Sequence, residues 1–238
     1  MKNKYSIFSL IKNAFSYHEN WQKAWKDPAP KKEYDAVIVG GGGHGLATAY
    51  YLAKEHNITN VAIIEKGWLG GGNMGRNTTI LRSNYMYDDN AMFSEVGMDL
   101  WRKMSQDLNY NVMFSPRGII NLAHSDAQMN VFARRGNSMR LNGIDALLLN
   151  REEVKEIIPM ADFSDNVRFP IFGGLMQPSA GTARHDAVAW GYARQADSMG
   201  VDIIQNCEVT GFDVVSGKIQ GVRTSRGDIK VKKIGLCV

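Results

Sequence analysis

The stretch VGGGGHGLATAYYL, residues 39–52, decides the fold class of this 238-residue chain. It places Gly40, Gly42 and Gly45 in the spacing G-x-G-x-x-G. An apolar, β-branched run at residues 34–39 leads into it, and apolar residues at helical spacing follow. A strand, a tight turn and a helix are therefore predicted. Gly40 allows the turn, Gly42 leaves room for a pyrophosphate, and Gly45 lets helix and strand pack closely.

A second apolar run, NVAIIEK at residues 60–66, predicts another buried strand and completes a βαβ unit. Glu65 stands at its end, twenty positions after Gly45. A carboxylate there accepts hydrogen bonds from ribose hydroxyls and repels a 2′-phosphate, which disfavours NADP. The glycine pattern alone leaves FAD and NAD open. The glycine-rich segment at residues 66–85 favours FAD, because NAD-binding units usually continue directly into the next helix.

The sequence after residue 85 predicts further helices and strands. A polar helix is expected over 125–141, and Asn150 with Glu153 predicts the capped start of another helix. A helix over 186–199 ending at Gly200 comes next, and then a short strand. Three further strands are expected, with turns at 216–217 and 226–227.

The predicted fold class is α/β. A Rossmann-like FAD-binding domain of the glutathione-reductase type is interleaved with a mixed-sheet substrate domain. The predicted segments are an arm and linker at 1–33, the FAD-binding domain at 34–110, a substrate and interface domain at 111–184, and a second, incomplete part of the FAD-binding domain at 185–238. Because the chain stops directly after an apolar strand, we expect it to be truncated at its C-terminus.

Composition excludes several classes of protein. The net charge of +4 is spread without a long basic run, so nucleic-acid binding is not expected. No stretch is long enough to span a membrane, and residues 1–21 predict a short amphipathic helix or arm rather than a signal peptide. Cys207 and Cys237 form no metal-ligand pattern and indicate a reducing compartment. A cytoplasmic location is expected.

Long motifs give the sequence a family resemblance. The segment from YDAVIVGGGGHGL to TTILRSNY, together with FSPRGIINLAHS, MQPSAGTARHDAVAWGYARQA and GVDIIQNCEVTGF, resembles the β subunits of heterotetrameric sarcosine oxidases, within the FAD-dependent amine oxidases. The resemblance covers essentially the whole chain and includes YSIFSLIKNAFSYHENW in the N-terminal arm.

The resemblance implies a division of labour between subunits. Sarcosine is oxidised at FAD, which the β subunit binds without a covalent bond, to glycine and a one-carbon unit. Electrons pass to an FMN attached covalently to a histidine, and O2 is reduced there to H2O2. The implied partners are α, γ and δ subunits, with NAD and tetrahydrofolate on the α subunit.

The same resemblance points to His185. The flavin-bearing histidine of the family stands in the context Gly-x-x-(Lys/Arg)-His-Asp, which matches Gly181, Arg184, His185 and Asp186. A neutral imidazole is a nucleophile that can attach FMN, and Arg184 can offset negative charge on the flavin. Without the resemblance, a helix-capping surface histidine is the simpler interpretation. The residues predicted to bind the cofactors are Gly40, Gly42, Gly43, His44, Gly45, Glu65, Lys66, Asn73, Arg76, Asn77, Thr78, Arg184, His185 and Val209.

Arg82 is the predicted catalytic residue. Its guanidinium group suits a bidentate contact with the substrate carboxylate, as the resemblance to single-subunit relatives implies. Those relatives carry a second arginine where this chain has Thr79. A surface salt bridge is the plainer alternative for Arg82. For the whole chain, the alternatives are oxidation of another N-methyl amino acid such as dimethylglycine, a flavin-binding fragment without turnover, and a NAD-dependent dehydrogenase.

Overall fold

The computed structural model describes residues 6–17, 19 and 23–238. The chain divides into two compact units. The first unit contains Met1–Trp68 and Ala193–Val238, and the second unit contains Leu69–Tyr192. These boundaries differ from the predicted ones at 110 and 184, and the assignment of the predicted segments as cofactor and substrate domains stays a prediction.

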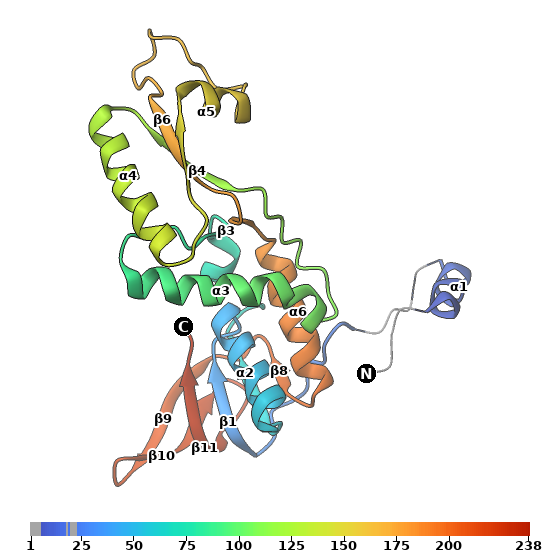
Figure 1. Cartoon of the computed structure of the whole chain (residues 1–238). Coiled ribbons are helices and arrows are strands. Elements are labelled where there is room, and N and C mark those ends of the chain that lie inside the picture. The colour runs from blue at the N-terminus through green and yellow to red at the C-terminus, as the bar shows by residue number, and fades with distance from the viewer. Residues whose placement is uncertain (1–5, 18, 20–22) are drawn as a thin grey trace. The chain divides into compact units, whose positions relative to one another are not determined.

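A six-stranded sheet forms the centre of the first unit (Figure 1). Four neighbouring strands pair in parallel and the last two pair antiparallel, so this sheet is mixed. In spatial order the strands are β8 (Asp202–Ile204), β2 (Val61–Ile64), β1 (Glu33–Val39), β11 (Ile229–Leu236), β10 (Lys218–Thr224) and β9 (Val209–Val215).

The predicted strand, helix and strand are confirmed. All four residues of β2 are buried, and Tyr34 and Val37 of β1 are completely buried, as expected for central parallel strands. Helix α2 (Gly43–His56) packs on both strands and buries Leu46, Ala49, Tyr50 and Ala53. The spacing of these four residues is the one from which the helix was predicted.

A three-stranded sheet in the second unit has the order β4 (Ile119–Ala123), β6 (Gly173–Gln177) and β5 (Leu147–Asn150). Both pairs are antiparallel, so the predicted mixed sheet is wrong for this block. Helix α4 (Asp126–Leu141) connects β4 to β5 and returns the chain in the same direction. Because β6 then enters between these two strands in the opposite direction, every pair is antiparallel.

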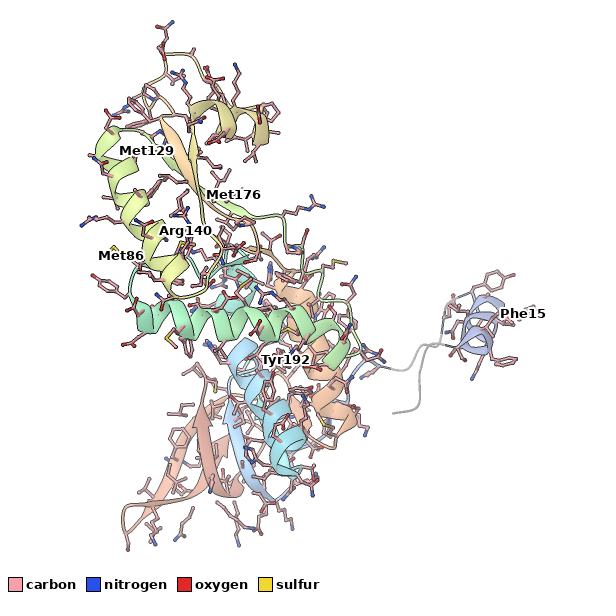
Figure 2. The ribbon with its side chains drawn as sticks, in the orientation of Figure 1. Phe15, Met86, Met129, Arg140, Met176 and Tyr192 are labelled. Atoms are coloured by element: carbon pink, nitrogen blue, oxygen red, sulfur yellow. The ribbon has the colours of Figure 1, made fainter. Side chains whose placement is uncertain are left out.

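Helix caps in the second unit agree with the sequence analysis. The Ser125 side chain caps α4, and Asn150 with Glu153 forms a reciprocal capping box at α5 (Arg151–Ile157). Helix α4 packs on β6, where a Cβ on Gly173 would come within 2.8 Å of the sulfur of Met129, a side chain labelled in Figure 2. The same Cβ would lie 2.5 Å from the carbonyl oxygen of Leu149, so glycine at this position lets β5 and β6 pair closely and also leaves room for the Met129 side chain.

Helix α3 (Asp88–Asp107) was not predicted. Its buried residues are only Ala91, Met98 and Met104. The exposed large apolar side chains on the same helix are Met92, Phe93, Val96 and Leu100. Because apolar residues occur on the exposed side as well as the buried side, the helix lacks the one-sided apolar periodicity on which a sequence prediction depends.

The predicted C-terminal elements are confirmed. Helix α6 (His185–Ser198) ends before Gly200, whose φ of +99° is the left-handed conformation expected of a helix stop. The turn between β9 and β10 places Ser216 at φ +50° and Gly217 at φ +75°.

Short elements complete the structure. They are α1 (Ile7–Phe15), whose apolar residues are mostly exposed, the 3-10 helix η1 (Asn73–Arg76), and the two-residue strands β3 (Ile80–Leu81) and β7 (Gly181–Thr182). The short amphipathic helix predicted near the N-terminus is confirmed for residues 7–15. Across the described part of the chain, no helix has the length and apolarity needed to span a membrane.

Candidate functional site

The glycine turn of the first unit has the geometry that its sequence predicts. Gly40 has a φ of +106°, and its N–H donates to the carbonyl oxygen of Ile64 at 2.8 Å. A Cβ at Gly40 would lie 2.5 Å from the carbonyl oxygen of Cys237, and a Cβ at Gly45 would overlap the carbonyl oxygen of Gly40. A larger residue therefore cannot replace either glycine without moving a strand or the helix.

Gly42 differs from its two neighbours in the pattern. A Cβ built on it meets no atom within 4 Å, so the backbone is open at this point. Gly42 is also the N-cap of α2, where no side chain caps the helix and no acidic residue stands in the first turn. The first N–H groups of a helix lack intrahelical acceptors and attract anions. The site therefore fits the diphosphate of a dinucleotide.

Glu65 connects the end of β2 to this turn. Its Oε2 accepts the N–H of Gly41 at 2.8 Å, and its Oε1 accepts the N–H of Gly67 at 2.8 Å. The carboxylate was predicted to bind a ribose, and its contact with the backbone was not predicted. Each carboxylate oxygen has a second lone pair, so both roles are compatible.

In the second unit, a short ladder brings the two predicted flavin segments together. Ile80 of β3 pairs with Thr182 of β7, and Leu81 pairs with Gly181. The carbonyl oxygen of Thr79 also accepts the N–H of Ala183 at 3.3 Å. The segment that carries Arg82 and the segment that leads into His185 therefore lie side by side within this unit.

His185 begins α6, and its ring is partly buried. Its Nδ1 atom is fully buried and has no hydrogen-bond partner among the described residues. A buried polar atom without a partner is costly, and local strain, an ordered water or a reactive role can account for it. This observation fits a covalent bond from the imidazole to a flavin.

Arg184 makes a contact that the sequence analysis did not foresee. Its Nε donates to Oδ1 of Asp186 at 3.0 Å, and its Nη2 donates to Oδ2. The Arg184 guanidinium is the main reason why the pKa of Asp186 lies below its usual value. The charge of Arg184 is thus already balanced, and Asp186 takes the favourable acidic place in the first turn of α6.

The other predicted cofactor ligands are distributed over both units. Lys66 and His44 are exposed in the first unit, and Val209 packs against the core there. In the second unit, Asn73 and Arg76 are exposed on η1, and Thr78 is exposed just after it. Asn77 is also exposed, and its side chain supports the local backbone by donating to Met74 O at 2.7 Å and accepting the N–H of Thr79 at 2.8 Å. The roles of these residues toward a cofactor stay predictions.

Arg82 lies directly after β3 and is partly buried, with its guanidinium carbon 5.8 Å from the ring centre of Tyr85. The residues that follow enter a buried polar cluster in which Ser83, Asn84 and Gln177 are completely inaccessible to solvent. This cluster was not predicted from the sequence. A buried glutamine within the apolar strand β6 was the only signal for it, and one polar residue in a strand is weak evidence.

The fold and the glycine turn define this chain as a dinucleotide-binding α/β protein. Residues 35–238 match the family model described as FAD dependent oxidoreductase. The chain therefore belongs to the FAD dependent oxidoreductase family, which confirms the predicted α/β FAD-binding fold class.

Known proteins similar to the chain agree with this family. It is 59% identical over 233 residues to sarcosine oxidase subunit beta of Rhizobium meliloti, covering 98% of this chain and 56% of that protein. It is 52% identical to sarcosine oxidase subunit beta of Rhodobacter capsulatus, covering 99% of this chain and 56% of that protein. The chain thus spans about half the length of these relatives. The crystal structure of L-proline dehydrogenase from P. horikoshii superposes with a TM-score of 0.79 at 27% identity, covering 88% of this chain and 54% of that one.

Proposed function

We propose that this chain is part of a flavoprotein subunit that oxidises the secondary amine sarcosine to glycine and a one-carbon unit. The similarity to two proteins named sarcosine oxidase subunit beta, at 59% and 52% identity over nearly the whole chain, carries this proposal. The open glycine turn and Glu65 support it, because they provide the site for FAD.

The first unit would hold FAD through the ADP half of the cofactor. The open backbone at Gly42 and the uncapped start of α2 would bind the diphosphate, and Glu65 would accept hydrogen bonds from the ribose. When bound, the flavin supplies the electron-accepting chemistry, and the protein orients the substrate. NAD in place of FAD would leave the match to an FAD-dependent family unexplained.

A second flavin, FMN, would be attached to His185. The unpartnered Nδ1 of this residue is compatible with the assignment, because no described residue holds this nitrogen in a hydrogen bond. Electrons would pass from FAD to FMN and then to O2, giving H2O2. The Arg184 and Asp186 pair would hold the start of α6 and so fix the direction of the His185 ring.

Arg82 would bind the carboxylate of the substrate. It is partly buried and makes no hydrogen bond or ion pair within the described part of the chain, so its five donors are available to an anion. The plainer alternative of a surface salt bridge is not favoured, because Arg82 has no carboxylate partner among the described residues. A bidentate guanidinium contact would orient the small substrate before oxidation.

The partners are proposed from the same similarity. Both relatives are named as a β subunit, so we propose that this chain assembles with α, γ and δ subunits. NAD and tetrahydrofolate would be bound by the α subunit, where folate would capture the one-carbon product.

The test uses the full-length protein produced together with its neighbouring subunits. We expect a yellow complex that forms H2O2 only when sarcosine is added, and a tryptic peptide containing His185 that carries the mass of FMN. A colourless complex, or one that leaves sarcosine unchanged while oxidising dimethylglycine, would contradict the proposed substrate or cofactor.

A further inference from the structure

The backbone that follows Arg82 is fixed by side chains from other elements of the second unit. The N–H of Ser83 donates to Oε1 of Gln177 at 3.0 Å, and Nε2 of Gln177 donates to Oγ of Ser83 at 2.7 Å. Glu95 of α3 accepts the hydroxyl of Ser83 at 2.5 Å. Ser83 and Gln177 are completely buried, so these hydrogen bonds are sheltered from water. Arg82 is therefore attached to a rigid support.

Arg135 of α4 donates hydrogen bonds to Asn84, the residue that follows Ser83. Its Nε donates to the carbonyl oxygen of Asn84 at 2.5 Å, and its Nη2 donates to Oδ1 of the same residue at 3.0 Å. The Asn84 amide donates in turn to Oδ1 of Asn121 at 2.8 Å. One guanidinium thus holds both the backbone and the side chain of Asn84, a fork that lysine cannot reproduce.

The charges in this region are unbalanced. Neither Arg82 nor Arg135 forms an ion pair with a carboxylate in the described ranges 6–17, 19 and 23–238. Glu95 is paired elsewhere, because its Oε1 accepts from Arg102 at 3.1 Å. Burial first, and then the positive charge of Arg82, lower the pKa of Arg135. Two partly buried cations that repel each other are stabilised when an anion binds beside them.

We propose that Arg135 is a positioning residue for the substrate carboxylate. It holds Asn84 so that the Arg82 guanidinium keeps its direction. Its positive charge adds to the electrostatic potential of Arg82, which favours amines that bear a carboxylate over amines that lack one. This inference rests on the proposed function for the identity of the substrate. It assigns to α4 a part in substrate selection that the sequence patterns did not indicate.

The experiment compares Arg135→Gln and Arg135→Lys with Arg134→Gln in the full-length complex. Arg134 is the neighbouring arginine on α4, and its exposed position makes it a matched control for loss of one positive charge. We expect Arg135→Gln to raise the KM for sarcosine about tenfold, with kcat changed less than about twofold. Arg135→Lys should restore part of this loss, because it keeps the charge but loses the fork. Arg134→Gln should leave the KM within about twofold of the original value.

A purely structural role predicts a different result. Damage to the fold would lower turnover of every substrate, so dimethylamine, which lacks a carboxylate, is the second substrate. An unchanged kcat/KM for dimethylamine beside a raised KM for sarcosine supports the proposal. An equal loss for both amines, or an unchanged KM for sarcosine, overturns it.

Binding of acetate, measured by calorimetry, separates this inference from the proposed function. If the complex binds acetate and Arg135→Gln weakens that binding about tenfold, the positioning role stands even where sarcosine proves not to be the substrate. If the original complex binds no acetate, or if Arg135→Gln binds it equally well, the positioning role is wrong.

Discussion

The carboxylate of Glu65 accepts the backbone N–H of Gly41 at 2.8 Å and so ties the end of β2 to the turn after β1. This contact shapes the turn that leaves Gly42 open to a ligand. A single residue thereby links the fold to cofactor binding, since the same carboxylate is proposed to hold the FAD ribose. The consequence can be measured with a substitution that keeps the size of the side chain.

Replacing Glu65 by Gln is expected to weaken FAD binding about tenfold to a hundredfold. The charge-assisted hydrogen bonds to Gly41 and Gly67 become neutral, and one amide N–H₂ group then faces a backbone donor. Titration of the full-length apoprotein with FAD, followed by flavin fluorescence, measures the loss. Glu55→Gln is the control, because Glu55 lies at the exposed end of α2. Equal FAD affinity in the original protein and Glu65→Gln would disprove this role.

Replacing His185 by Ala should remove the covalently bound flavin and leave the dissociable one in place. The reason is that His185 is the residue proposed to carry FMN, and its Nδ1 has no hydrogen-bond partner among the described residues. After denaturation with acid, the original complex should retain flavin absorbance in the protein pellet, while the variant should release all of it. His56→Ala, at the exposed end of α2, should behave like the original. Retained flavin in the His185 variant would place the link on another residue.

Replacing Gly45 by Ala should destabilise the first unit by about 1–3 kcal/mol, because the new methyl group would overlap the carbonyl oxygen of Gly40. Gly97→Ala, within α3, is the contrasting substitution. A Cβ there meets no atom within 4 Å, so alanine should stabilise the helix by up to about 1 kcal/mol. Urea unfolding of both variants measures the two free energies. Opposite signs are expected, and a neutral Gly45→Ala would show that the turn can shift to make room.

Part of this structure could be predicted from the sequence because its signals are local. Gly40, Gly42 and Gly45 specify one turn, and Asn150 with Glu153 specifies one helix start. The polar contacts of the site are not local. Arg135 reaches a residue 51 positions away, and Ser83 reaches Gln177 across 94 positions. No periodicity or spacing in the sequence relates such pairs, so only the fold shows that Arg82 is held by a buried polar cluster.

The stability of the first unit should fall in strongly alkaline solution through Tyr34. Its hydroxyl donates to Oδ2 of Asp202 at 2.9 Å and accepts the N–H of Lys31 at 3.0 Å. Burial, together with the charge of Asp202, raises the pKa of Tyr34 above its ordinary value near 10. Because the folded pKa is the higher one, the stabilisation is complete below about pH 10 and is lost as the pH rises above it.

Tyr34→Phe tests this alkaline dependence. The variant loses the hydroxyl and should be less stable at pH 7 by about 1–2 kcal/mol, since the Lys31 N–H and the Asp202 carboxylate each lose a partner. Above pH 10 the gap should narrow, because the phenol then ionises in the unfolded original while the folded protein keeps it neutral, and the variant has no phenol to ionise. Unfolding curves in urea at pH 7, 9 and 10.5 provide the comparison. A difference in the free energy of unfolding that stays constant over this range would mean that Tyr34 does not control the loss of stability in alkaline solution. Tyr17→Phe is the control, because Tyr17 is exposed, and it should unfold with the same free energy as the original at each pH.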